Sequence, residues 1–180
     1  LKQKGEIFTI QDQDEMWQVS KFQKWITIVQ PEIIAIESMV YNEQYKEAGT
    51  LDLLLKINEG KYCIAGKTPL ELPPGRYVAD LKSGGHYDES SLQVAAYAEM
   101  VNNDPSNAEH KDDVKGTLVI HLNSIVKTGI PGLSTYYRNQ EEIKEDFQQY
   151  RHVAQVWEDQ NKNAMPRLLE FPSIITKQEV

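Results

Sequence analysis

A single carboxylate interrupts the most apolar stretch of this sequence. Residues 49–57 are Gly-Thr-Leu-Asp-Leu-Leu-Leu-Lys-Ile, and the turn-forming residues Asn-Glu-Gly follow them. A short apolar run that ends at a turn signal predicts a β-strand. Asp52 lies inside this run, where burial of its charge costs free energy unless another group compensates for it. A metal ion is a natural compensator.

A second chemically distinctive strand is predicted at residues 76–82. Side chains alternate between the two faces of a strand, so Asp80 and Lys82 point into the same space. If the two strands are antiparallel neighbours, Asp52 and Asp80 face each other and offer hard oxygen ligands to Mg²⁺ or Mn²⁺. Lys82 would then orient a water for attack on a phosphodiester. Taken alone, Asp80 and Lys82 also fit an exposed pair at a strand edge.

Hydrophobic spacing predicts further elements on both sides of these strands. Helices are expected at residues 14–29, with Asp14 as N-cap, at residues 89–101, and from Asn139 onward, where Asn139 and Glu142 match a capping box. Strands are expected at residues 33–41, 116–122 and 133–138, and a third strand at 61–65 is expected to resume at 76–82 after a hairpin tip at 66–75. The last helix is predicted to pack on the sheet through Ile143, Phe147, Tyr150, Ala154 and Trp157.

The size of the chain fits one domain. Its 180 residues are 40% hydrophobic and 26% charged, which suffices for one substantial core. We expect residues 1–180 to form a single α/β domain, in which a mixed central β-sheet is flanked by helices. The core is expected at about residues 14–160, and residues 161–180 are expected to form a loosely attached tail.

The composition excludes some kinds of metal site and argues against some classes of protein. Cys63 is the only cysteine, which excludes internal disulfides and metal sites built from several thiolates of this chain. No stretch approaches the apolar length of a membrane span, and we expect a soluble, cytoplasmic protein. The net charge of −8 argues against a protein that coats nucleic acid, although a nuclease site is itself a concentration of carboxylates. A protein partner or an oligomer is one possible source of the basic surface that the chain lacks.

The order of several residues then carries a family resemblance. Glu37 lies in a predicted strand, Gly-Thr-Leu-Asp at 49–52 opens the next, Asp-Leu-Lys at 80–82 ends a third, and Gln93 and Tyr97 are four apart on a helix. This series resembles the RecB-type branch of the PD-(D/E)xK nuclease superfamily, which includes phage exonucleases and the mitochondrial genome maintenance exonuclease. The resemblance covers residues 33 to 101.

The resemblance implies a fold, an activity and a set of roles. It implies a restriction-endonuclease-like core that hydrolyses DNA phosphodiesters with Mg²⁺ or Mn²⁺, in the form of an exonuclease of DNA recombination, repair or phage DNA processing. Asp52, Asp80 and the backbone carbonyl of Leu81 would bind the metal, and Lys82 would serve catalysis. The helix that carries Gln93 and Tyr97 would pack beside the site.

One departure concerns a further metal ligand. Many relatives carry a histidine on a helix before the first strand, whereas residues 1–32 contain no histidine. Either a residue upstream of Leu1 supplies this ligand, or Glu37 takes its place. Glu37 lies among isoleucines, an apolar setting that favours a bound partner, but a strand residue facing solvent is the alternative.

Other residues have competing interpretations. Gln93 also completes a capping-box pattern with Ser90, and Tyr97 is equally compatible with the core. His86 and Tyr87 follow two glycines in a loop that can bring them onto a nucleic-acid strand, although a solvated loop histidine is the simpler alternative. Rival functions are a restriction-like endonuclease, a nuclease-fold domain that binds nucleic acid without cutting, and a carboxylate-rich metal binder. For the last of these Lys82 is a poor choice, because it repels the cation.

Overall fold

A five-stranded mixed sheet forms the centre of the structure. The computed structural model describes residues 12–64, 69–84, 87–104, 113–124 and 132–163. The sheet has the strand order β1-β2-β5-β6-β7. Its strands are β1 Glu32–Asn42, β2 Glu47–Ile57, β5 Gly75–Lys82, β6 Val114–Ser124 and β7 Gly132–Asn139. The helices are α1 Gln13–Val29, α2 Glu89–Asn103 and α3 Gln140–Gln160.

The strand directions confirm the predicted fold class. β5 and β6 run parallel, and α2 forms the crossover between them. The other three neighbouring pairs are antiparallel, and they include β2 and β5, so the condition set for Asp52 and Asp80 to face each other is met. The fold is therefore a mixed α/β sheet with helices on its faces.

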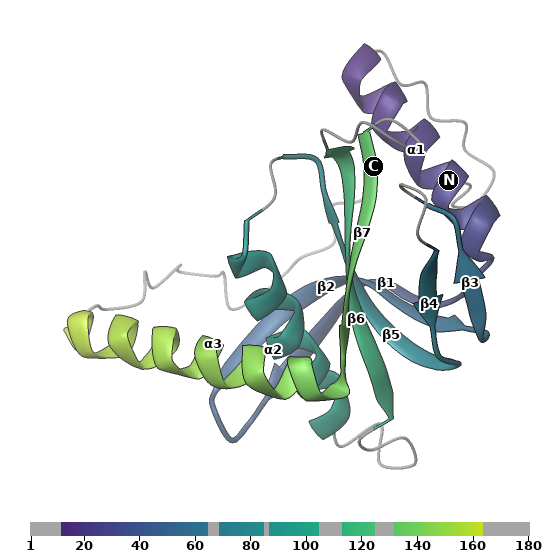
Figure 1. Cartoon of the computed structure of the whole chain (residues 1–180). Coiled ribbons are helices and arrows are strands. Elements are labelled where there is room, and N and C mark those ends of the chain that lie inside the picture. Colours follow the sequence, from purple (N-terminus) through teal and green to yellow (C-terminus); the bar gives the residue numbers. More distant parts are fainter. Residues whose placement is uncertain (1–11, 65–68, 85–86, 105–112, 125–131, 164–180) are drawn as a thin grey trace, which may run out of the picture.

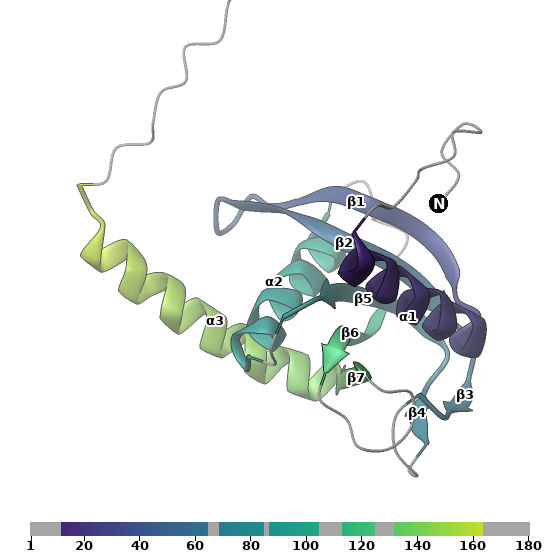
Figure 2. The same ribbon diagram turned by 90° about the horizontal axis from the view of Figure 1, so that it is seen from above.

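The helices lie on opposite faces of the sheet (Figures 1 and 2). α1 covers one face, where Trp25 is fully buried and its indole N–H donates to Thr135 Oγ1 of β7 at 3.0 Å. α2 covers the other face and buries Val94, Ala95 and Ala98 against the sheet. The alternation of apolar side chains along β5 and β6 supplies both cores, because successive residues point to opposite faces.

Two predicted boundaries were wrong. Asp12, not Asp14, is the N-cap of α1, and its carboxylate accepts from the backbone N–H groups of Asp14 and Glu15. The expected strand at 61–65 does not continue into β5. It is β3 (Gly60–Tyr62), which pairs with β4 (Leu70–Leu72) in a separate two-stranded sheet. Residues 65–68 between them lie outside the described part of the chain.

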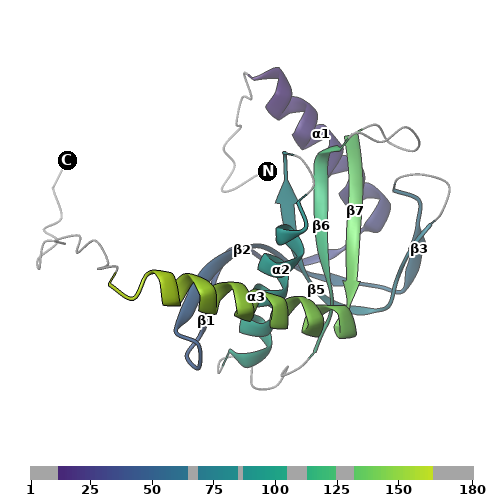
Figure 3. The same ribbon diagram turned by 60° about the vertical axis from the view of Figure 1, so that its left-hand side comes forward.

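The packing of α3 also differs from the prediction. Asn139 and Glu142 do form the capping box, but α3 packs chiefly against α2 and touches the sheet less (Figure 3). Of the predicted stripe, Ile143 is buried, whereas Trp157 is exposed. The second half of α3 extends past the elements against which its first half packs, so the periodic pattern overstated the buried length.

The ends of the predicted domain are only partly described. Residues 1–11 and 164–180, which include most of the predicted tail, lie outside the described residues. None of the helices in the described ranges combines the length and the apolar character needed to cross a membrane.

Gly116 of β6 offers a direct test of the packing. A methyl group there would lie 2.5 Å from Tyr137 and 2.7 Å from Tyr77, both on rings that the core holds in place. We expect Gly116→Ala to lower the free energy of unfolding by about 1–3 kcal/mol, the usual cost of overpacking. Gly84→Ala is the matched control because no atom lies within 4 Å of its added methyl group. Equal urea midpoints for the two variants would contradict this packing.

Candidate functional site

The candidate site lies where β2 and β5 separate. Backbone pairing between them runs from Ile57 and Gly75 to Leu53 and Ala79. The next step in this register would place Asp52 opposite Asp80. Instead, Asp52 Oδ2 accepts a hydrogen bond from the backbone N–H of Leu81 at 2.8 Å. The carboxylate therefore satisfies a backbone donor that the ladder leaves without a strand partner.

A local irregularity in two strands gives Asp52 this position. Leu51 packs in the core on the α2 face, whereas Leu53 packs in the core on the α1 face. Residues two apart in a regular strand share a face, so β2 is distorted between them. On β1 the residue opposite Asp52 is Glu37, since its neighbours Ile36 and Ser38 pair with Leu53 and Leu51. Glu37 has a φ of 47°, which marks a matching irregularity in β1.

Asp80 and Lys82 meet on the α2 face of β5. Lys82 Nζ lies 3.1 Å from Asp80 Oδ1, where it donates a hydrogen bond, and 2.8 Å from Oδ2. The contact to Oδ2 is an ion pair without hydrogen-bond geometry, so this buried oxygen accepts no hydrogen bond from the described residues. The Asp80 side chain is 4% exposed and that of Lys82 is 30% exposed. One end of the pair is buried, and the other reaches solvent.

The electrostatics of this pair are unfavourable for the aspartate. Burial raises the pKa of Asp80 above its ordinary value, and the nearby carboxylate of Asp52 raises the pKa further. The hydrogen bond and charge of Lys82 oppose both effects. A cation bound between Asp52 and Asp80 would offset this electrostatic cost, because it favours the charged form of both carboxylates.

Two residues of α2 hold Lys82, Gln93 directly and Tyr97 through Gln93. Gln93 Oε1 accepts a hydrogen bond from Lys82 Nζ at 3.1 Å, and Gln93 Nε2 donates to the Tyr97 hydroxyl at 3.1 Å. The Tyr97 ring lies over Gly49, where a methyl group would be only 2.5 Å from it. This explains why a glycine suits the position three residues before Asp52. Gln93 is therefore bonded to Lys82 instead of serving as a helix cap, since the N-cap of α2 is Asp88.

The remaining predicted residues are less closely integrated. Glu37 is exposed, and Tyr87 is 66% exposed in the loop before α2. His86 lies outside the described residues. The structure thus brings together Asp52, Asp80, Lys82, Gln93 and Tyr97, with Leu81 bonded to Asp52.

The donor set is compatible with a hard divalent cation, although it is not a complete cage. No group of three or more His, Cys, Asp and Glu side chains among the described residues is arranged to hold a metal. Mg²⁺, however, usually takes only one or two carboxylates and completes its shell with water and phosphate oxygens. Asp80 Oδ2 is buried, lies 2.8 Å from the Lys82 ammonium and accepts no hydrogen bond from the described residues, which leaves it available as a ligand.

His121 is a residue near the site that the sequence analysis did not single out. It is fully buried on β6, where it is the register partner of Lys82. Its ring makes an edge contact with Tyr136, with 5.3 Å between the ring centroids. The same signal that marked Asp52, a polar residue within an apolar strand, was present at His121.

The Asp52–Leu81 hydrogen bond can be tested alone. Asp52→Ala leaves the Leu81 N–H without its acceptor, and we expect a loss of about 1–3 kcal/mol in stability. Asp52→Asn keeps a carbonyl oxygen that can accept, so its loss should be smaller. Hydrogen exchange of the Leu81 amide, followed by NMR, should be faster in Asp52→Ala than in Asp52→Asn. Unchanged protection in both variants would contradict the bond.

Comparisons with protein-family models and with curated proteins each gave no match. A functional proposal for this chain therefore depends on the side chains at the separation of β2 and β5, together with the sequence resemblance described above.

Proposed function

We propose that this chain is a Mg²⁺- or Mn²⁺-dependent nuclease that hydrolyses DNA phosphodiester bonds. The observation that carries the proposal is the convergence of Asp52, Asp80 and Lys82 where β2 and β5 separate. Two carboxylates beside a partly exposed ammonium are expensive to maintain in a strand core, and such costs are characteristic of functional sites. The carboxylates suit a hard cation, and the ammonium suits a phosphate.

The ligands of the cation would be the carboxylates of Asp52 and Asp80 and the backbone carbonyl of Leu81. When bound, the ion supplies Lewis-acid stabilisation of the charge that develops on the phosphoryl oxygens. The hydrogen bond from Leu81 N–H fixes one oxygen of Asp52 and so orients the carboxylate. Burial keeps water away from Asp80 and strengthens its attraction for a cation.

Lys82 would act on the attacking water and the phosphate. An ammonium has three donor hydrogens, and that of Lys82 donates to Asp80 Oδ1 and to Gln93 Oε1, lies 2.8 Å from Asp80 Oδ2, and belongs to a side chain that is 30% exposed. Its solvent-exposed side can donate to a phosphate oxygen or to the water that attacks phosphorus. Gln93, held in turn by Tyr97, would keep the ammonium directed toward the substrate.

The exonuclease form of the activity follows from the sequence resemblance. The substrate would be DNA ends or single strands, and Tyr87, exposed before α2, would touch the strand beside the site. A restriction-like endonuclease and a binding domain without activity are the outcomes that the first experiment below separates.

Loss of the ammonium should slow cleavage strongly. We expect purified protein to degrade labelled linear or single-stranded DNA with Mg²⁺ or Mn²⁺ but not with EDTA. Lys82→Ala should lower the rate by about 100-fold or more, the usual scale for a positioned electrostatic or acid–base group. Lys56→Ala is the matched control, since Lys56 is an exposed lysine of β2.

The substrates decide between the rival functions. Cleavage of closed circles would identify an endonuclease. Binding without metal-dependent cleavage of any substrate would identify a non-catalytic domain and would overturn the proposal.

Metal binding should also be visible without catalysis. At a concentration 100-fold above its Kd, a ligand that binds only the folded state adds about 2.7 kcal/mol of stability. We expect Mn²⁺ to raise the Tm of the wild-type protein, and Asp80→Asn to lose most of this shift. Asp159→Asn, at an exposed acid of α3, should keep it. Equal shifts in the two variants would show that the ion binds elsewhere.

A further inference from the structure

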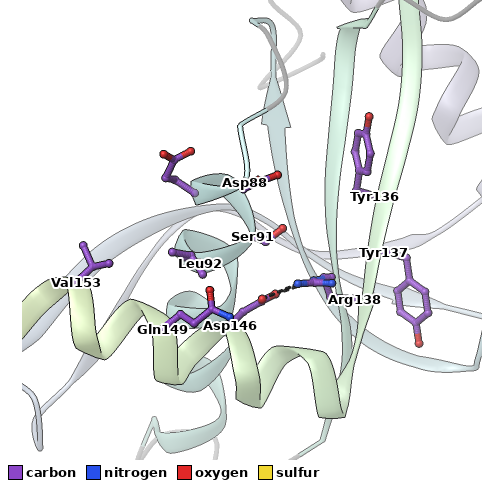
Figure 4. A pocket seen from close by; sticks show the side chains of 10 residues that line it. Asp88, Ser91, Leu92, Tyr136, Tyr137, Arg138, Asp146, Gln149 and Val153 are labelled. Carbon is purple, nitrogen blue, oxygen red and sulfur yellow. Dashed lines mark hydrogen bonds and ion pairs between the residues drawn. The ribbon is translucent and has the colours of Figure 1, made fainter.

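A hollow of about 630 Å³ opens beside the candidate site (Figure 4). It lies between the first turns of α2, the strand β7 and the helix α3. Its lining includes Asp88, Ser91, Leu92, Tyr136, Arg138 and Gln149. None of these residues takes part in the proposed hydrolysis, so the hollow can have a separate role.

The hollow adjoins the candidate site through α2 and through the sheet. Leu92 lines the hollow, and the next residue, Gln93, is bonded to Lys82. Across the sheet, Val119 is the register partner of both Asp80 and Tyr136. Paired residues share a face, and neighbouring strands lie about 4.8 Å apart. The backbones of Tyr136 and Asp80 are therefore about 10 Å apart, and their side chains lie on the same face. One unstacked nucleotide can bridge this separation.

Tyr136 has the properties of a stacking platform for a base. Its side chain is 40% exposed, whereas His121, which its ring meets at an interplanar angle of 82°, is fully buried. The buried histidine thus supports the ring from within the protein. Aromatic side chains stack on any base, because every base has a π-face.

The charges of the hollow favour a base over a phosphate. Arg138 is its cation, but Asp146 binds the guanidinium through two hydrogen bonds of 2.7 and 2.6 Å, and Glu142 adds a third at 3.3 Å. Asp88 and Glu89 at its rim repel phosphate. The hydroxyl of Ser91 and the amide of Gln149 can bond the edge of a neutral base. The phosphate is better placed at Lys82.

Helix α3 limits what can enter. Asp146, Gln149 and Val153 form the α3 side of the hollow, and the ion pair between Arg138 and Asp146 fastens this helix to β7. In Figure 4, α3 starts at the end of β7 and runs across α2 below the hollow. A strand that passes from the candidate site into the hollow meets this helix, so the hollow fits the end of a chain better than a continuous one.

We propose that this hollow binds the terminal base of a DNA strand whose phosphodiester lies at Asp80 and Lys82. The inference rests on the proposed nuclease function and deepens it, because it assigns the terminal base of the strand to a binding site of its own. Tyr136 stacks on the base, the polar side chains of Ser91 and Gln149 contact its edge, and α3 stops the strand.

The substrate itself provides the first test. Two single-stranded oligonucleotides are compared, one intact at both ends and one with an abasic site in place of the base at each end. The wild-type protein should cleave the abasic substrate with a KM about 5- to 100-fold higher, the range expected for one lost stacking contact. An unchanged KM would overturn the proposal without any variant.

Three variants assign the contact. Tyr136→Ala should raise the KM for the intact oligonucleotide and remove its advantage over the abasic one, while Tyr136→Phe should retain both. Tyr41→Ala, at an exposed tyrosine of β1, is the matched control. Thermal unfolding followed by circular dichroism establishes that each variant is folded.

The failure of this inference and that of the nuclease proposal are distinguishable. If the wild-type protein and Tyr136→Ala cleave both oligonucleotides alike while Lys82→Ala is inactive, the base-binding role is wrong and the nuclease proposal stands. If the wild-type protein cleaves no DNA with Mg²⁺ or Mn²⁺, both are wrong.

Discussion

The hydrogen bond from the Leu81 N–H to Asp52 Oδ2 is the interaction on which the candidate site depends. Where β2 and β5 separate, the amide of Leu81 has no strand partner, and a buried donor without an acceptor is costly. A carboxylate accepts this hydrogen bond while its second oxygen remains in position for another partner. The two strands can therefore part without losing the pairing of this amide, and the space between them is bordered by Asp52 and Asp80.

The arrangement of the other site residues follows from the free-energy cost of burying the Asp80 carboxylate. Its burial raises the pKa and disfavours the charged form, so the pair with Lys82 must be maintained by its surroundings. Helix α2 supplies them, because Gln93 holds Lys82 and Tyr97 holds Gln93. The Tyr97 ring in turn requires a glycine at position 49 of β2. Strand, helix and neighbouring strand are thereby connected through side chains, and displacement of α2 would release the lysine.

The sequence was informative where its signals were local and periodic. The apolar run around Asp52 and the alternation at Asp80 and Lys82 predicted both strands and the face that the acid and amine share, whereas their antiparallel pairing was only a condition of the argument. Tertiary packing decided what these signals left open. The sequence position of Gln93 is compatible both with a capping box at Ser90 and with a hydrogen bond to Lys82. Only the position of α2 over β5 decides between these two roles. The positive φ of Glu37 and the separate pairing of β3 with β4 have no comparable pattern in one sequence.

The irregularity at Glu37 bears on how many protein ligands a cation would have. Regular pairing would set Glu37 beside Asp52, yet its φ of 47° and its exposed side chain set it apart from the buried Asp80. A site with two carboxylates and one backbone carbonyl leaves most of the coordination shell of Mg²⁺ to water and phosphate oxygens. On the proposed function, such a site binds its cation weakly alone and more tightly with DNA, because the scissile phosphate itself becomes a ligand. A third protein carboxylate would increase affinity for the free ion, but it would also repel the phosphate on which Lys82 acts.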